Sequence, residues 1–378
     1  MKLLSFILLV FFVFYANGQV LKTIWEIVGA SESKTFYETL NLDKFESISN
    51  RLQDPLSNNT LFLPTESATQ SAIKNNFFSN KTTEDELLYH MLGEIYDFNA
   101  FFSIRYYLKT LSPKYPTIIV TPQETDIFSI KFQVLAGPII ANILNYTQCS
   151  NGIIYHVDQF LLAPLNIIDT ISFLSNLDIL ENEIKAQNLS SIFANSNSTT
   201  IFAPIDSAWS IYNGSANIPY GTIIHNLEYE VVDGIYYHRN FSYFNYTLHT
   251  HYLSTPMTVL SFSNGSIVAM NGDTYEYYDM PPQKSTVTAN VIRTDILTSN
   301  GTVIHLVDKI LPANSKADLM LINNRKSTIA TTSHHDDKLF INNNNSNAIS
   351  SSSANHTTTF PLILFISIIN GILLYCAK

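Results

Sequence analysis

The sequence predicts an α+β protein in which one unit occurs twice. Two segments of the chain recur, and each copy places helical patterns before strand patterns. Helices followed by strands within a unit are typical of α+β folds. A chain of 378 residues also accommodates two domains of ~150 residues each. We expect a first repeat at residues 21–164 and a second repeat at residues 165–313.

The first recurring segment predicts a strand that leads into a helix. TLFLPTESA, which contains Phe62 and Pro64, recurs as TIFAPIDSA, which contains Phe202, Pro204 and Asp206. Proline interrupts a strand because it lacks a backbone N–H, and a polar residue shortly after it can cap the following helix.

The second recurring segment predicts a hairpin that feeds a long, largely buried strand. NGIIYHVDQFLLAP begins at Asn151 and recurs as NGTVIHLVDKILPA, which begins at Asn300 and Gly301 and contains His305 and Asp308. Asn-Gly favours a tight hairpin turn, and the β-branched run after it favours a strand.

The stretches between these segments fit the same order of elements. Each copy opens with a helical pattern whose apolar residues share one face, namely Ile24, Ile27 and Val28 in the first copy and Ile167, Ile168, Ile171 and Leu174 in the second. Residues 83–86 form a helix-capping box. Residues 259–278 predict a β-meander with two Asn-Gly turns.

The composition indicates a secreted glycoprotein and argues against a nucleic-acid binder. Charged residues make up only 14%, below the ~25% of an average soluble chain, and the net charge of −10 comes without a basic run. With two cysteines a disulfide framework is excluded, and we expect Cys149 to be buried. We expect N-linked glycans to supply the missing solvation. The expected sites are Asn58, Asn80, Asn145, Asn188, Asn197, Asn213, Asn240, Asn245, Asn264, Asn300 and Asn344.

Both ends of the sequence predict processing. Residues 1–18 resemble a secretory signal peptide, so we expect the mature chain to begin at Gln19; the alternative is a buried N-terminal helix. Residues 314–359 are rich in Ser, Thr and Asn and predict a disordered stalk. Small residues at Ser350, a polar spacer and the apolar residues 360–378 form a signal for glycosylphosphatidylinositol (GPI) attachment. The alternative is a single membrane-spanning helix.

No pattern predicts catalysis or a cofactor. The sequence lacks the GxSxG elbow, HExxH, a Gly-rich loop ending in GK, and CxxC. His249 and His251 lie two apart in a strand-like run, but two His lack the further ligands of a stable zinc site. We therefore interpret them as an exposed strand face, and we expect no enzyme activity, no metal and no cofactor.

TIFAPIDSAW and the run from Asn300 to Pro312 resemble the two signature segments of fasciclin domains. The resemblance covers residues 21–313. It implies a compact wedge of β-strands flanked by helices in each repeat, used outside the cell in adhesion and matrix contacts. In the first repeat, Leu63 stands where the family usually has Ala, and Glu66 stands where it has Asp or Asn.

The second signature differs between the copies. The family places two apolar residues between its His and Asp, as the segment His305 to Asp308 does, whereas the first repeat has only Val157 between His156 and Asp158. Successive strand residues point to opposite faces, so we expect Asp158 to face away from the position that Asp308 takes.

The resemblance also suggests two candidate ligand-binding elements. Tyr89-His90 matches a Tyr-His motif linked to integrin-type binding, with His225 as the expected counterpart in the second repeat. The alternative that we favour is a structural His90 that donates a hydrogen bond to the backbone and joins helix to sheet.

Asp295-Ile296 is the second candidate, because it resembles an Asp-Ile element linked to the same binding. Asn142-Ile143 is its expected counterpart without the acid. The alternative is that Asp295 merely caps an exposed turn.

Together these observations favour a GPI-anchored glycoprotein on the outer face of the plasma membrane that mediates adhesion or matrix contact through tandem fasciclin domains. Its partner would be a cell-surface receptor, a matrix component or a second copy, and many copies on a membrane would add avidity. The alternative is a passive structural coat or stalk without a specific ligand. Because the second repeat has Asp295, we expect it to bind, and we expect Asp295→Ala to weaken attachment without lowering stability.

Overall fold

The computed structural model describes residues 21–102, 105–126, 129–194, 198–214, 223–241, 246–252, 256–261, 267–271 and 287–313. The expected signal peptide, stalk, Ser350 attachment site and apolar tail lie outside these residues, as do the sequons at Asn197, Asn245, Asn264 and Asn344. Within the described ranges, no helix combines the length and apolar character needed to cross a membrane. Both repeats belong to one compact unit of the chain.

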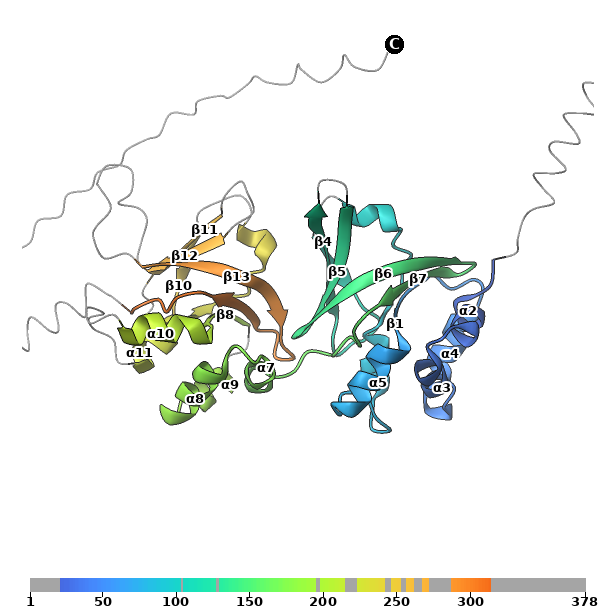
Figure 1. Cartoon of the computed structure of the whole chain (residues 1–378), viewed down its shortest axis with the longest axis horizontal. Helices are drawn as coiled ribbons and strands as arrows, with labels where there is room; N and C mark the ends of the chain where they lie inside the picture. The colour runs from blue at the N-terminus through green and yellow to red at the C-terminus, as the bar shows by residue number, and fades with distance from the viewer. Residues whose placement is uncertain are drawn as a thin grey trace, which may run out of the picture. The chain divides into compact units, whose positions relative to one another are not determined.

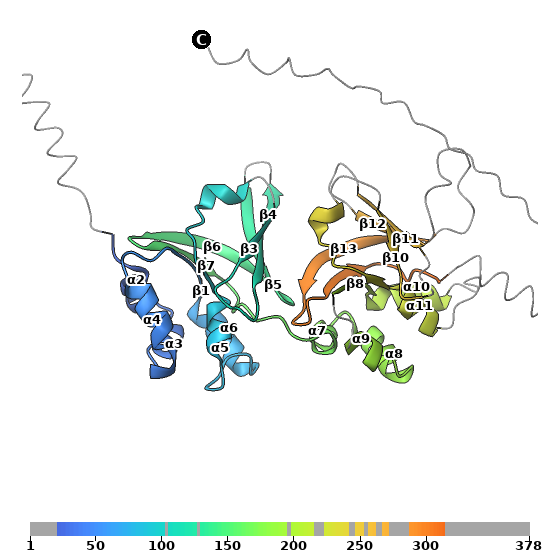
Figure 2. The ribbon, with the colours of Figure 1, turned by 180° about the vertical axis from the view of Figure 1, so that it is seen from behind.

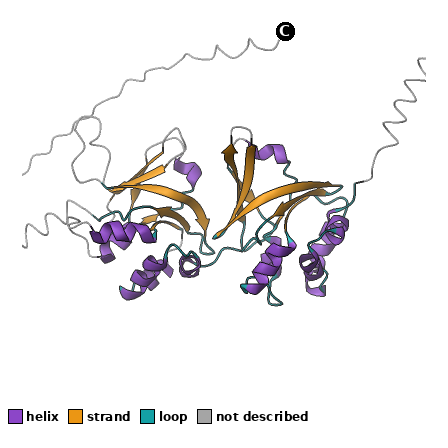
Figure 3. Cartoon of the chain, in the orientation of Figure 1, coloured by secondary structure: helices purple, strands orange, loops and turns teal. Residues whose placement is uncertain are grey.

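Each repeat has the predicted α+β composition (Figures 1 and 3). The helices of the first repeat are α2 (Ile24–Ala30), α3 (Lys34–Leu40), α4 (Glu46–Gln53), α5 (Glu66–Lys74) and α6 (Glu84–Leu88). Its strands are β1 (Asn59–Pro64), β2 (Met91–Leu92), β3 (Tyr106–Lys109), β4 (Thr117–Asp126), β5 (Ser129–Ala136), β6 (Ile139–Cys149) and β7 (Gly152–Val157).

The second repeat contains the same number of α-helices and strands in the same order, and the first repeat has in addition a 3-10 helix at Asp43–Phe45. Its helices are α7 (Ile167–Phe173), α8 (Asp178–Ala186), α9 (Ser190–Ala194), α10 (Asp206–Gly214) and α11 (Ile223–Tyr229). Its strands are β8 (Thr199–Pro204), β9 (Val231–Asp233), β10 (Tyr246–His249), β11 (Pro256–Ser261), β12 (Ile267–Asn271), β13 (Thr288–Leu297) and β14 (Val303–Val307). Short 3-10 helices lie at Phe98–Phe102 and His238–Phe241.

The two seven-stranded sheets have one topology. Their strand orders, β2-β1-β7-β6-β5-β4-β3 and β10-β11-β12-β13-β14-β8-β9, coincide when the second is read backwards. In each sheet the first long strand pairs in parallel with the last. Bridges from Leu92 to Thr110 and from Val232 to Thr250 join the outer strands, so each sheet closes on itself like a barrel.

Each sheet is buried on both sides along its central strands. In β1, Leu61 points to the core shared with the helices, and Phe62 points to the core inside the sheet. In β8, Ile201 and Phe202 divide in the same way. Figure 2 shows the labelled α-helices of each repeat along one side of its sheet, with the short 3-10 helix of each repeat at the opposite end. Alternating burial of this kind explains why both strands are continuous apolar runs in the sequence.

Several local predictions are confirmed. Thr83 and Glu86 form the expected capping box at the start of α6, and β7 and β14 are largely buried. Gly152 is required at its position because a Cβ atom there would lie 1.9 Å from the carbonyl oxygen of Asn59. The Asn-Gly turn thus sets how closely β7 approaches β1.

Candidate functional site

The acidic residue of the first signature holds the start of a helix in both repeats. The carboxylate of Asp206 accepts a hydrogen bond from the backbone nitrogen of Ile179 at 2.9 Å, in the first turn of α8. Glu66 accepts one from the backbone nitrogen of Thr35 at 3.0 Å, in the first turn of α3. An anion at a helix N-terminus satisfies a backbone donor that the helix leaves unpaired. Glu66 therefore has the same role as Asp206.

The Asp that follows the last strand also has matching partners. Asp308 accepts hydrogen bonds from the backbone nitrogen and the side-chain amide of Asn290, at 2.7 and 2.6 Å. Asp158 accepts the same pair from Asn142, both at 2.7 Å. The expectation that Asp158 faces the other way is therefore wrong. Asn142 is the counterpart of Asn290, and not of Asp295 as we expected.

The second signature of the first repeat is one residue shorter, and this residue is missing from the turn before β7 and not from the strand itself. Phe62 in β1 pairs with Tyr155, and Phe202 in β8 pairs with His305. Tyr155, and not His156, is therefore the counterpart of His305. The second repeat has its extra residue in the turn around Gly301, whose φ is +77°.

Tyr155 and His305 anchor the same loop. The Tyr155 hydroxyl donates to the carbonyl oxygen of Tyr96 at 2.7 Å, and His305 Nε2 donates to the carbonyl oxygen of Tyr236 at 2.8 Å. His305 Nδ1 accepts a hydrogen bond from the backbone nitrogen of Asp295 at 3.2 Å, so the ring is neutral with its proton on Nε2. Burial lowers the pKa of His305.

Tyr89 and His90 are fully buried, so neither can contact a partner in this arrangement. The Tyr89 hydroxyl donates to the carbonyl oxygen of Thr117 at 3.3 Å, and His90 Nδ1 lies 3.0 Å from the carbonyl oxygen of Phe62. Because a carbonyl oxygen only accepts, Nδ1 carries the proton. This is the structural role that we favoured from the sequence. Burial lowers the pKa of His90 to about 4.

Tyr229-Glu230 is the counterpart of Tyr89-His90, so the expected match with His225 is wrong. The backbone nitrogen of Phe202 donates to the carbonyl oxygen of Glu230 at 2.9 Å. The first repeat has the same bond, also 2.9 Å, between Phe62 and His90.

Glu230 places a carboxyl group in the core of the second repeat. It is 1% exposed, and its Oε1 accepts a hydrogen bond from the backbone nitrogen of Leu311 at 2.8 Å. Its Oε2 has no hydrogen-bond partner among the residues that the structure describes. Burial raises the pKa of Glu230 well above its ordinary value. The neutral acid is the form that such a site favours.

Asp295 lies within β13, and the expectation of an exposed turn is wrong. The register between β13 and β14 shifts between Arg293 and Ile296, so this segment forms a β-bulge. Asp295 has a φ of +61° and is 1% exposed, and Ile296 is fully buried. Neither residue can contact a partner in this arrangement.

The Asp295 carboxylate joins the two repeats. Its Oδ2 accepts hydrogen bonds from Arg105 Nη1 at 2.5 Å and from the Tyr107 hydroxyl at 2.8 Å, both in the first repeat. Its Oδ1 accepts one from the backbone nitrogen of His238 at 2.7 Å. The carboxylate side chain has no exposed area and Arg105 retains 20%. We call the set of Asp295, Arg105, Tyr107, His238, Tyr237 and Arg293 the junction.

Aromatic and apolar side chains surround the ion pair. The rings of Tyr107 and Tyr237 lie 5.1 Å apart in an edge contact, and the Arg239 guanidinium lies 4.3 Å from the Tyr107 ring centroid. Burial, followed by the Asp295 charge, raises the pKa of Tyr107. Buried apolar residues of both repeats complete the contact, namely Ile119, Leu135, Leu297 and Val303.

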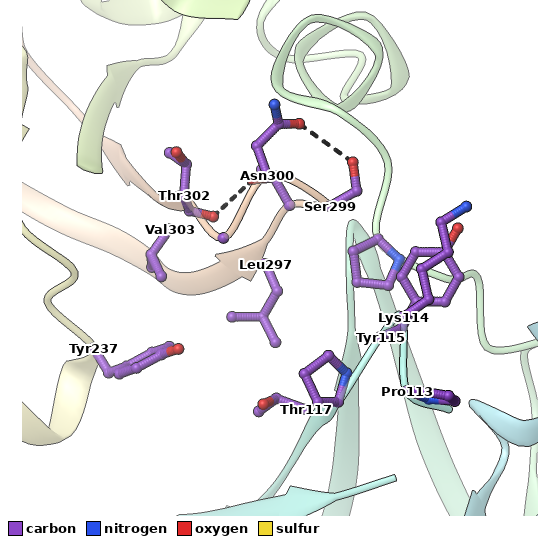
Figure 4. Close-up of a pocket in the computed structure, with 14 residues that line it drawn as sticks. Pro113, Lys114, Tyr115, Thr117, Tyr237, Leu297, Ser299, Asn300, Thr302 and Val303 are labelled. Carbon is purple, nitrogen blue, oxygen red and sulfur yellow. Dashed lines mark hydrogen bonds between the residues drawn. The ribbon is translucent and has the colours of Figure 1, made fainter. Parts of the chain in front are cut away.

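A cleft of about 350 Å³ opens between the repeats (Figure 4). Residues 113–117 and Pro164 line it from the first repeat, and Tyr237 and residues 297–303 line it from the second. Lys114 is its one charged lining residue, and the lining contains no carboxylate, His or Cys.

The remaining predicted positions are structurally ordinary. His249 is exposed, and His251 Nε2 lies 3.0 Å from Asp233 Oδ1. Within the described ranges, no group of His, Cys, Asp or Glu is arranged to hold a metal ion. Cys149 is buried, as predicted, and burial raises the pKa of its thiol to about 11.

The sequons that the structure describes differ in exposure. Asn58, Asn80, Asn145 and Asn188 are exposed. Asn240 and Asn300 are half-buried, and Asn213 lies in α10.

Two comparisons with known proteins gave matches. A solved structure of a FAS1 domain pair from the insect cell adhesion molecule fasciclin I is similar at 16% identity, covering 77% of this chain and 99% of that chain with a TM-score of 0.36. No curated protein matches the sequence. The Fasciclin domain family matches twice, over residues 31–163 and over residues 175–313. These two matches take in most of the chain, which therefore belongs to the fasciclin domain family.

Proposed function

We propose that this chain is a cell-surface adhesion protein whose two fasciclin domains act as one coupled unit. The observation that carries the proposal is the junction, where a fully buried carboxylate is bound by groups from both repeats. Separating the repeats would break this ion pair and the hydrogen bond from Tyr107, and it would also expose the apolar residues that pack beside them. A coupled pair holds its outer surfaces in one orientation, and this suits a contact that must bear load between cells.

The family supports an adhesive role rather than a catalytic one, because fasciclin domains are used in adhesion and matrix contacts. Both candidate elements are buried and bind within the chain: His90 Nδ1 donates to the carbonyl oxygen of Phe62, and the Asp295 carboxylate binds Arg105. The adhesive contact must therefore use exposed residues. Its partner is a receptor, a matrix component or a second copy.

Membrane attachment completes the proposal. A signal peptide at residues 1–18 and a GPI signal around Ser350 would place the repeats on the outer face of the plasma membrane. Phosphatidylinositol-specific phospholipase C should then release the protein from intact cells. Retention in the membrane with an intact C-terminal peptide, seen by mass spectrometry, would indicate a spanning helix.

Cell cohesion tests the adhesive role. Cells that display the full-length chain should aggregate more than cells without it, and Arg105→Ala should reduce aggregation because it uncouples the repeats. Lys185→Ala is a matched control, because Lys185 forms an exposed pair with Glu181 within one helix. Equal cohesion with and without the chain would favour the passive coat. Full cohesion by Arg105→Ala would show that adhesion does not depend on coupling of the repeats.

A further inference from the structure

The face of the second repeat that binds the first repeat is built on β13 and the loop after β9. Asp295, which the backbone of His238 holds in place, binds Arg105 and Tyr107. Arg293 adds a hydrogen bond from its Nη2 to the carbonyl oxygen of Pro138 at 2.6 Å. Burial against the first repeat lowers the pKa of Arg293 to about 10. This face is therefore a docking face for a neighbouring fasciclin domain.

The strand register identifies the equivalent face of the first repeat. Arg293 pairs with Leu306, and Asn145 pairs with His156, which holds the same place on the neighbouring strand. Asn145 is thus the counterpart of Arg293. Tyr146 follows at the place of the Asp295 bulge. We call this region of β6, together with Ile95 and Phe102, the outer face.

The outer face is apolar and exposed. Leu144 is 55% exposed, Tyr146 45%, Ile95 47% and Phe102 41%. The Tyr146 ring stacks on Phe98 with centroids 5.0 Å apart, and Phe98 in turn contacts Phe102 at 5.4 Å. A cluster of exposed apolar side chains usually marks a surface that something covers.

A sequon lies on the same strand, between Leu144 and Tyr146. Asn145-Tyr146-Thr147 has the Asn-x-Thr pattern, and Asn145 is exposed. Its counterpart, Arg293, is the side chain that reaches across to the neighbouring repeat. A glycan attached at Asn145 would therefore occupy the space in which a further domain would dock. Sugar rings also carry apolar C–H faces that pack on aromatic and aliphatic side chains.

We propose that Asn145 carries an N-linked glycan that covers the outer face and prevents a second copy from docking there end to end. The inference rests on the proposed secretory route, because N-glycans are added along it. An unblocked end-to-end contact is heterologous, and repetition of such a contact builds open chains rather than closed dimers. The glycan would thus end the row of fasciclin domains at two.

The test uses full-length protein made in eukaryotic cells and released from their surface. Glycopeptide mass spectrometry should find Asn145 occupied. Asn145→Gln should give a sedimentation coefficient that rises with protein concentration and should increase the binding of an apolar fluorescent dye. Asn188→Gln, which removes another exposed sequon, should change neither property. Adding Leu144→Ser and Tyr146→Ser to Asn145→Gln should restore the concentration-independent value.

The outcomes separate this inference from the function on which it rests. Glycans at other sequons but not at Asn145, or an Asn145→Gln protein with wild-type sedimentation and dye binding, would overturn the inference alone. The absence of glycan from every sequon would overturn the secretory route, and the inference with it.

Discussion

The two repeats build one fold with different residues at several equivalent positions. A tyrosine, Tyr155, donates to a loop carbonyl in the first repeat, and a histidine, His305, donates to the equivalent carbonyl in the second. Glu66 and Asp206 each hold a helix start, and Asp158 and Asp308 each hold an Asn. The fold therefore requires a hydrogen bond at each of these places and tolerates different side chains that supply it.

A second kind of difference has another cause. Tyr146 in the first repeat is exposed, whereas its counterpart Asp295 is buried and paired. The fold of the second repeat explains part of this contrast, because β13 has a bulge at Asp295 and the backbone nitrogen of His238 donates to its carboxylate. Arg105 and Tyr107 of the first repeat bind the other carboxylate oxygen and complete its burial. Burial at this position therefore depends on both the local strand and the neighbouring repeat.

The largest effect is expected at this position. Asp295→Ala should destabilise the chain by roughly 3–5 kcal/mol, because it leaves Arg105 without its anion and removes the acceptor of Tyr107. Alanine also disfavours the φ of +61° that Asp295 adopts. Chemical denaturation of the full-length chain measures the change. Lys185→Ala, at an exposed pair, should change stability by about 0.5 kcal/mol or less.

This expectation reverses the one that followed from the sequence, in which Asp295→Ala left stability unchanged. A wild-type melting temperature in Asp295→Ala would restore that view and contradict the junction.

The second effect concerns pH and compares His90 with Glu230. The native pKa of His90, about 4, lies below its ordinary 6.5, so the unfolded chain binds a proton that the native chain does not. Stability should therefore fall as pH falls between these values, by at most about 3 kcal/mol. The pKa of Glu230 is raised, so the native carboxyl keeps a proton that the unfolded one loses, and stability should fall as pH rises above about 4.5.

Glu230→Gln measures this difference, because glutamine keeps the shape without the charge. It should raise the melting temperature at about pH 7.5 and leave it unchanged at about pH 4. His90→Gln should reduce the loss of stability in acid. The acid response of His305 is present in wild type and in both variants, so it cancels in the comparison. Equal gains from Glu230→Gln at both pH values would show that titration is not the cause.

The sequence predicted the architecture well and several pairings poorly, for physical reasons. The repeats, the buried strands and the capping box at Thr83 follow from local patterns that one repeat contains. The matches of His156 with His305 and of His225 with His90 were wrong because they followed residue type. The fold preserves register instead, and it absorbs the length difference in the Asn-Gly turn. A comparison aligned on Asp158 and Asp308 could have placed Tyr155 correctly.

The contact between Arg105 and Asp295 could not be predicted from the sequence. Arg105 and Asp295 belong to different repeats, and no periodicity within one repeat connects them. The β-bulge at Asp295 likewise arises from pairing with β14, and the residues that flank Asp295 in the sequence do not predict this bulge.

The third prediction tests the equivalence of the two Asp residues. Asp158→Ala and Asp308→Ala should each lower stability by about 0.5–1.5 kcal/mol, because each removes the acceptor of two hydrogen bonds that one Asn donates. Equal losses, measured by chemical denaturation, would support the register in which both Asp residues hold an Asn. A neutral Asp158→Ala beside a harmful Asp308→Ala would favour the opposite-face arrangement that the sequence suggested.

The smallest effect is expected from Cys149→Thr. The second repeat has Thr298 near this place, where its hydroxyl donates to the carbonyl oxygen of Thr302 at 2.9 Å. A threonine at position 149 can form the corresponding bond across its own turn, so stability should change by about 1 kcal/mol or less. A larger loss, measured by the same denaturation assay, would show that the two turns are not interchangeable.

The coupling of the two repeats is tested most directly by a double-mutant cycle between Arg105 and Asp295. Arg105→Ala, Asp295→Asn and the double variant are compared with the full-length chain by chemical denaturation, and asparagine is used because it tolerates the positive φ. A pair that joins the repeats should give a coupling energy of about 1–3 kcal/mol. Additive effects, to within about 0.5 kcal/mol, would contradict a coupled domain pair.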